Sequence, residues 1–296
     1  MYKKFVTAFM LAVLSAISIS TVHFTHRNNG PAAIAKAAES DKTELLQTRK
    51  EVVKAIRKDL LNRKSRIEVA FKDSVRKEIN DLGELMEEVM AYDSDANAKD
   101  ADYLEYSLTG WSVQMEWIKG RSASLMLEVS YKCTLKEEKE LDKKAAGVLK
   151  ALKLEKASDV KKVRAIHDYI VKRVNYDLTY EKASAYDALI GKSAVCEGYA
   201  MAAYLMFTQA GLDCKIIGGT ADGEAHAWNI VKVDGKWYNI DLTWDDPITS
   251  DGTEMLMYDY YLKSTADFKD HKRDAAYRTD EFVKAHPIAK TSYAFN

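Results

Sequence analysis

The sequence predicts an α+β fold in which a buried helix packs against an antiparallel sheet. The helix is indicated by an apolar run over residues 199–210, which is apolar on nearly every side and stops at Gly211. The sheet is indicated by Asp234 and Gly235, which stand between two alternating apolar runs and are typical of a two-residue hairpin turn. Hydrophobic residues make up 47% of the chain and charged residues 30%, which favours a globular protein over a disordered one.

Residues 1–37 are expected to be a targeting segment. Lys3 and Lys4 precede an apolar run over residues 5–19, and the sequence Ala-Lys-Ala at residues 35–37 resembles a signal-peptidase site. We therefore expect a bacterial protein that is secreted or held at the cell surface. Cleavage elsewhere and retention of the segment as a single membrane anchor are the alternatives.

The charge balance argues against a nucleic-acid partner. Removal of residues 1–37 would leave 40 Lys and Arg residues against 45 Asp and Glu residues, a net charge of −5. A mildly acidic chain lacks the basic surface that nucleic acid requires, and membrane contact is expected only through an uncleaved N-terminal segment. With three cysteines, Cys133 and Cys214 could pair and leave Cys196 free, but nothing in the sequence places the two close together.

Residues 38–135 are predicted to form a small α+β module without a chemical motif. Its expected role is packing, substrate docking or placement near the cell wall. The expected elements, in order, are a helix (43–61), a strand (66–71), a helix (74–90), a polar loop (93–102) and three strands (103–108, 113–118 and 124–134).

Residues 136–296 are predicted to form the second domain, and a charged stretch at 136–144 is expected to mark the boundary. Two helices, a strand or edge segment, and a surface tail from Lys263 onward surround the central helix and hairpin. Their expected ranges are 141–152 and 159–175 for the helices and 255–262 for the edge segment. His167 lies inside the second helix, where packing or capping is expected rather than catalysis.

The second domain contains the groups of a thiol acyl-transfer site, Cys196, His226 and Asp241. If the Asp-Gly dipeptide forms the hairpin turn, Val233 lies opposite Lys236. That register puts His226 and Asp241 on one face as diagonal neighbours, with Cα atoms roughly 7–8 Å apart. A one-residue slip would separate them.

Cys196 precedes the apolar run and is expected at the N-terminus of the buried helix. The partial positive charge of a helix N-terminus favours a thiolate, and the backbone N–H of Cys196 could help to hold a developing oxyanion. Each residue alone has a more ordinary explanation as a buried cysteine, a hydrogen-bonded histidine or a helix cap. The agreement between hairpin register and helix start favours a joint site.

Three segments, VCEGYA, HAWN and DLTWDD, resemble the core motifs of the bacterial transglutaminase-like superfamily, and the resemblance extends over about residues 160–262. The superfamily core is similar to that of papain-type cysteine proteases and peptide N-glycanases. The resemblance implies a papain-like α+β core with Cys196 as nucleophile, His226 as general base and acid, and Asp241 as the orienting acid. Superfamily members include protein cross-linkers, proteases, amidases and proteins with no shown activity.

Two aromatic residues are weaker candidates for contacts with substrate or oxyanion. On the hairpin register Trp228 lies on the face of His226, where it could wall an acyl-binding groove or simply fill the core. Tyr186 is the candidate for a second oxyanion donor.

No cofactor or metal is expected. Asp245, Asp246, Asp251 and Gly252 lack the spacing of an EF-hand loop, and a solvated turn is the expected structure there.

Three functions remain open from the sequence. The favoured one is an exported thiol enzyme acting on amide bonds of proteins or peptides, with cell-wall peptide among the candidate substrates. Water as acceptor would give hydrolysis, and an amine would give cross-linking. The alternatives are a non-catalytic binding or adaptor module, which an unreactive buried Cys196 would favour, and a structural surface protein in which the N-terminal module is the working part.

Overall fold

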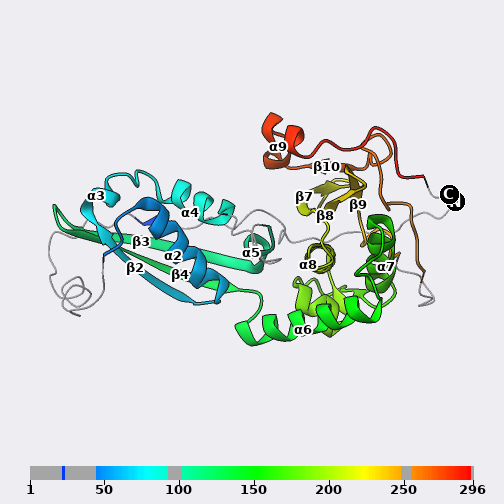
Figure 1. The fold of residues 1–296 in the computed structure, drawn as a ribbon, viewed down its shortest axis with the longest axis horizontal. Coiled ribbons are helices and arrows are strands. Elements are labelled where there is room, and N and C mark those ends of the chain that lie inside the picture. The colour runs from blue at the N-terminus through cyan, green and yellow to red at the C-terminus, as the bar shows by residue number, and fades with distance from the viewer. Residues whose placement is uncertain (1–21, 24–44, 93–101, 248–254, 295–296) are drawn as a thin grey trace.

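The computed structural model describes residues 22–23, 45–92, 102–247 and 255–294. The predicted targeting segment 1–37 lies outside these residues except for Val22 and His23, as do nearly all of the predicted loop at 93–102 and Asp251 with Gly252. Two hydrophobic cores organise the described chain, one in the N-terminal module and one around helix α8 (Figure 1). None of the helices in the described part is long and apolar enough to cross a membrane.

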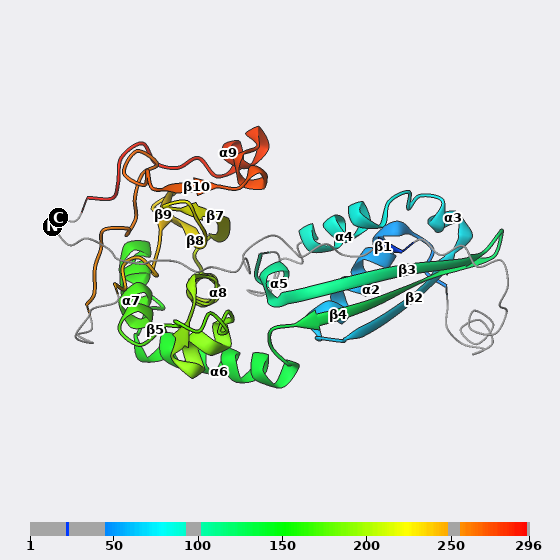
Figure 2. The same ribbon diagram turned by 180° about the vertical axis from the view of Figure 1, so that it is seen from behind.

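The N-terminal module is a four-stranded sheet, in the order β1-β3-β4-β2, that packs against helices α2 and α4 (Figure 2). Strands β2 and β3 both pair with β4 in antiparallel fashion, and the short β1 pairs with β3 in parallel. Its elements are β1 (Val22–His23), α2 (Arg49–Leu61), β2 (Arg66–Lys72), α3 (Asp73–Arg76), α4 (Leu82–Ala91), α5 (Asp102–Ser107), β3 (Leu108–Ile118) and β4 (Ser122–Tyr131).

Capping residues explain where the helices of this module differ from prediction. Thr48 closes a capping box with Glu51, so α2 starts at residue 49 rather than 43. The predicted helix over 74–90 is wrong, because Asp81 accepts hydrogen bonds from two backbone N–H groups and starts a new helix, α4.

The predicted strand over 103–108 is also wrong. Residues 102–107 form the short helix α5 at the junction of the two cores (Figure 1). Tyr103 packs into the core around α8, and Leu104 packs into the N-terminal core. The short helix thus buries two adjacent side chains in two separate cores.

The second unit places helix α8 against a sheet in the order β10-β7-β8-β9, and this confirms the predicted α+β class (Figure 1). Neighbouring strands of this sheet are antiparallel. The elements are α6 (Leu135–Ala151), α7 (Asp159–Val171), β5 (Asn175–Tyr176), η1 (Asp187–Gly191), β6 (Ser193–Ala194), α8 (Cys196–Gln209), β7 (Cys214–Ala221), β8 (Glu224–Val233), β9 (Lys236–Ile240), β10 (His271–Arg273), η2 (Ala275–Arg278) and α9 (Asp280–Ala285).

Two sequence predictions in this unit are confirmed. Val233 pairs with Lys236, and Asn229 pairs with Ile240, which is the predicted hairpin register. Helix α8 is buried on nearly every side, starts at Cys196, and ends before Gly211, whose φ of +81° suits a glycine after a helix.

The charged stretch at 136–144 lies within α6, which begins at Leu135 behind a Thr134 capping box. Within the stretch Glu138 and Leu141 are buried, and Glu138 forms an ion pair with Arg63 of the N-terminal module, so the stretch is part of a packed helix.

The C-terminal part differs from the prediction in two places. Residues 255–262 form no strand, and a single bridge between Asn239 and Lys263 connects this region to β9. The expected surface tail instead supplies strand β10, which pairs with the free edge of β7.

Candidate active site

Cys196 is the first residue of α8 and is 1% exposed. The first turn of the helix packs closely on the chain that precedes it. A Cβ added at Gly198 would lie 2.6 Å from the Cβ of Ala194 and 2.9 Å from the carbonyl oxygen of Ser184. Glycine two residues after Cys196 is therefore required for α8 to begin at this position.

His226 and Asp241 meet as the hairpin register predicts. Nε2 of His226 on β8 lies 2.7 Å from Oδ2 of Asp241, which follows the last residue of β9. Ala227 and Asn229 lie on the opposite face of β8 from His226 and face helix α8. The Asn229 side chain donates to the carbonyl of Ala200 in that helix.

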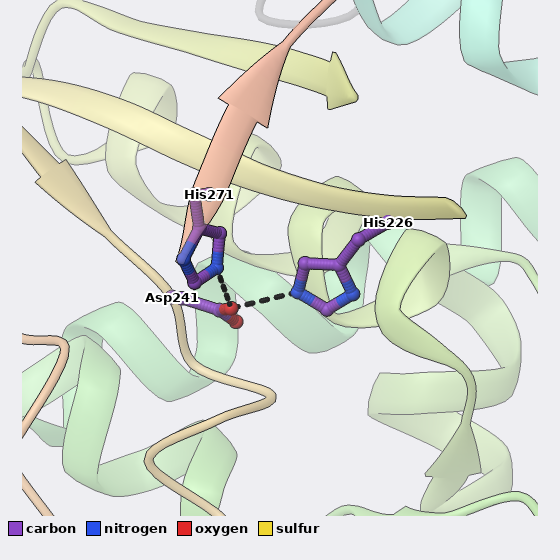
Figure 3. A group of neighbouring side chains, drawn as sticks. All are labelled: His226, Asp241 and His271. Carbon is purple, nitrogen blue, oxygen red and sulfur yellow. Dashed lines mark hydrogen bonds and ion pairs between the residues drawn. The ribbon is translucent and has the colours of Figure 1, made fainter. Parts of the chain in front are cut away.

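Four hydrogen bonds hold the Asp241 carboxylate. Oδ1 accepts from the backbone N–H groups of Thr243 at 2.9 Å and Trp244 at 3.2 Å. Oδ2 faces Nε2 of His226 and Nε2 of His271, at 2.7 and 2.9 Å (Figure 3). Burial raises the pKa of Asp241, but the charges and hydrogen bonds of the two imidazoles outweigh burial and hold that pKa well below its usual range.

His226 is correspondingly biased toward its charged form. Burial lowers the pKa of His226, yet the charges of Asp241 and Cys196 and hydrogen bonds to both side chains raise it to about 10. Since Nε2 bonds to Asp241, Nδ1 is the ring nitrogen left for the thiol of Cys196. His226 thus contacts both Cys196 and Asp241, while the catalytic roles of the three residues stay predictions.

His271 is the residue that the sequence reasoning missed. Its ring is fully buried, its Nε2 lies 2.9 Å from Oδ2 of Asp241, and its Nδ1 lies 3.1 Å from Oδ1 of Asp270. Figure 3 shows the rings of His226 and His271 converging on Asp241 from different strands. The surrounding sequence is rich in Lys and Asp and has no periodic apolar pattern, so no local signal distinguished His271 from a surface residue.

The two weaker candidates have different surroundings. Trp228 is buried, its ring centroid lies 6.3 Å from that of His226, and its indole N–H finds no hydrogen-bond partner among the described residues. It packs with Phe268 in a small cluster on the His226 face of the sheet. The Tyr186 hydroxyl donates to Glu140 on α6 at 3.1 Å, so its oxyanion role stays a prediction.

A second buried histidine cluster lies beside the first. His167 on α7 faces Asp168 through Nδ1 at 3.1 Å and Asp245 through Nε2 at 3.0 Å. The predicted solvated turn is wrong for Asp245, which is completely buried. Its carboxylate oxygens are satisfied by His167 and by the backbone N–H of Tyr260. The bonding of His167 agrees with the expected packing role.

His226, Asp241 and His271 could also hold a metal ion, since one ligand atom from each lies within 4.8 Å of the others. Both imidazoles lie at hydrogen-bond distance from Asp241, so the three side chains already satisfy one another by hydrogen bonds. The three cysteines are free, and Cys133 and Cys214 do not form a bridge.

Residues 146–242 match the family model of the transglutaminase-like superfamily, which confirms the resemblance drawn from the sequence. The range contains Cys196, His226 and Asp241 and ends before His271.

Kyphoscoliosis peptidase from Homo sapiens is 30% identical over 140 residues, which cover 40% of this chain and 21% of that protein. The Mus musculus protein is 32% identical with the same coverage. The chain therefore spans about a fifth of the length of these curated relatives.

Among solved structures, a TGase has a TM-score of 0.35 and 20% identity over 46% of this chain and 45% of its own. The periplasmic domain of TgpA from Pseudomonas aeruginosa, bound to ethylmercury, has a TM-score of 0.30 and 14% identity over 45% of this chain and 65% of its own.

Proposed function

Because residues 146–242 carry a core of the transglutaminase-like superfamily, we propose that this chain is a thiol-dependent acyl-transfer enzyme acting on amide bonds of proteins or peptides. The observation that carries the proposal is the contact of Cys196, at the N-terminus of α8, with an imidazole that Asp241 already binds. This arrangement joins a nucleophile, a proton carrier and an orienting acid.

In the first half-reaction the Cys196 thiolate bonds to the amide carbonyl carbon. The carbonyl electrons move to oxygen, and backbone N–H groups of the first turn of α8 are the proposed oxyanion donors. When the C–N bond breaks, the leaving amine takes a proton from Nδ1 of His226. The acyl group remains on Cys196 as a thioester.

In the second half-reaction the acceptor attacks the thioester. Water or a primary amine bonds to the carbonyl carbon and gives a proton to Nδ1 of His226, while the C–S bond breaks and restores the thiolate. Asp241 stays ionised throughout and holds the ring through Nε2. Water gives hydrolysis and an amine gives cross-linking, so the choice depends on which acceptor reaches the thioester.

We further propose that the enzyme is secreted or held at the cell surface, with cell-wall peptide among its substrates. The support is the sequence of residues 1–37, with its two lysines and apolar run. Fractionation of a bacterial host that expresses the full chain tests this. Recovery of the protein in the cytoplasm at full length would contradict export.

Acylation of Cys196 tests the proposed chemistry. The protein is incubated with a casein digest as a mixed peptide substrate, with and without a biotinylated alkylamine, and adducts are mapped by mass spectrometry. We expect an acyl adduct on Cys196 or a new peptide or amide product, lost in Cys196→Ala and retained in Cys133→Ser. Absence of both adduct and product, while Cys196 still reacts with iodoacetamide, would contradict the proposal.

The burial of Cys196 favours a second candidate, a non-catalytic binding module on the same fold. With 1% exposure the thiol has little room for an acyl donor as the chain stands. This candidate requires that Cys196 alkylates slowly and that Cys196→Ala leaves partner binding unchanged.

A further inference from the structure

The C-terminal segment brings a second imidazole to the proposed triad. Lys263 forms a bridge with β9, and His271 pairs with β7. Strands β9 and β7 lie on opposite sides of β8. Phe268, between these two points, packs with Trp228 on the sheet face that carries His226. The segment therefore crosses that face of the sheet and places Phe268 and His271 beside Trp228 and His226.

Strand β7 is shaped to let this segment approach. Gly219 lies between His226 on β8 and Arg273 on β10 in one cross-strand row. A Cβ at Gly219 would lie 2.2 Å from the carbonyl oxygen of Lys272 and 2.8 Å from Cη2 of Trp228. Only glycine allows β10 and the indole to sit this close to β7.

The hydrogen-bond geometry around Asp241 assigns the donors of the cluster. Oδ1 of Asp241 accepts from two backbone N–H groups, and Oδ2 lies within 2.9 Å of both imidazole nitrogens. In a carboxylate that accepts at both oxygens, Nε2 of His226 and Nε2 of His271 are the donors. The other nitrogen of His271 faces Asp270, whose second oxygen accepts from the Tyr260 hydroxyl at 2.6 Å. The ring of His271 is thus held from both sides and donates to the same oxygen as His226.

We propose that His271 is a positioning residue: its Nε2–H fixes the Asp241 carboxylate in the orientation that directs His226 toward Cys196. The inference rests on the proposed function and extends it to a residue outside the range that matches the family. Ring packing alone is the competing explanation, because the His271 ring centroid lies 3.9 Å from that of Phe268 and 4.6 Å from that of Trp244.

Two substitutions separate donation from packing. His271→Phe keeps an aromatic ring against Phe268 and removes the donor, whereas His271→Gln removes the ring and keeps an N–H near the position of Nε2. The rate of Cys196 alkylation by iodoacetamide is measured in both, together with thermal stability, in the full chain with Cys133 and Cys214 replaced by serine. His286→Gln is the matched control in the same C-terminal part, since its imidazole contacts the backbone of Phe282.

The proposal expects His271→Phe to lose about tenfold in rate, the effect of one charge-assisted hydrogen bond, and His271→Gln to stay within about threefold of wild type. His286→Gln should match wild type. If His271→Phe alkylates at the wild-type rate and His271→Gln is slow, ring packing explains the residue and the proposal is overturned. Wild-type alkylation rates in both variants would also overturn it.

A proton spectrum separates failure of this inference from failure of the proposed function. The imidazole N–H shared by His226 and Asp241 should give a downfield resonance that Asp241→Asn removes. We expect His271→Phe to shift or broaden that resonance and His271→Gln to preserve it, whether or not Cys196 is reactive. An unchanged resonance in His271→Phe would overturn the positioning role. If the resonance changes in His271→Phe but the wild-type thiol is unreactive, the proposed enzymatic function fails and the positioning role stands.

Discussion

Two buried histidine clusters lie side by side in this protein, and they differ in what their carboxylates accept. Asp241 receives two imidazoles and two backbone N–H groups, and its pKa is held well below the usual range. Asp245 receives one imidazole and one backbone N–H, and burial raises its pKa. Burial alone therefore does not decide the charge of a carboxylate, because the donors and the charges around it also shift its pKa.

The clusters also differ in what lies beyond the histidine. His226 contacts the thiol of Cys196, the proposed nucleophile, so the negative charge of Asp241 can act on that thiol through the imidazole. His167 continues to Asp168, which in turn binds Arg164 and Tyr258, so its cluster ends in further structural bonds. We therefore expect substitutions in the first cluster to alter reactivity and substitutions in the second to alter stability.

The sharpest contrast is between Asp241→Asn and Asp245→Asn. Loss of the orienting carboxylate in Asp241→Asn is expected to lower turnover on amide substrate by about 10³–10⁴-fold. The Asn side chain no longer holds the His226 imidazole in its working tautomer. Asp245→Asn should stay within about threefold of wild type. Steady-state kinetics on any substrate found by the acylation screen measures both, and equal losses would break the comparison.

The second prediction concerns stability. His167→Ala leaves the completely buried Asp245 carboxylate without its imidazole. We expect a loss of about 3 kcal/mol in the free energy of unfolding, typical of breaking a buried pair. Urea denaturation measures it. If His167→Ala is as stable as wild type, the His167 cluster is not structural. The rate of Cys196 alkylation is the control and should be the same in this variant as in wild type.

The third prediction uses pH. His226 has a pKa of about 10 in the folded protein, while an unfolded imidazole titrates near 6.5. A raised pKa contributes stability that is fully present below about pH 6.5 and is lost as pH rises through about 10. Between these limits wild type should lose on the order of 2–4 kcal/mol more than His226→Gln in urea unfolding. Parallel pH profiles would contradict the charged state of His226.

The smallest effect is expected at β7. Gly219→Ala forces a Cβ against the backbone of β10 and should cost about 1–3 kcal/mol in unfolding free energy while it slows Cys196 alkylation. Gly218→Ala is the matched control, because its Cβ would first meet a side-chain atom, the Tyr106 hydroxyl at 3.0 Å, and not the backbone of β10. If both variants behave alike, the approach of β10 to β7 does not govern the site.

Sequence predicted the parts of the site that depend on local patterns. The Asp-Gly turn gives the register that joins His226 to Asp241, and the apolar run after Cys196 gives the helix that presents the thiol. Both signals lie within a few residues of the elements they specify.

The missed parts depend on distant contacts. His271 meets Asp241 across 30 residues, and His167 meets Asp245 across 78, so neither pairing leaves a periodic trace in the sequence. The break between α3 and α4 and the helical turn at α5 were missed for a related reason. One depends on a single cap at Asp81, and the other joins two cores at Tyr103 and Leu104.

The most direct test of the central claim is the pH dependence of Cys196 alkylation by iodoacetamide, in wild type and His226→Ala, with Cys133 and Cys214 replaced by serine. The account predicts fast reaction well below pH 8.5, where an ordinary thiol ionises, and loss of that reaction in His226→Ala. A slow reaction that rises only near pH 8.5 and is the same in both proteins would contradict an activated thiol and leave the binding module as the better account.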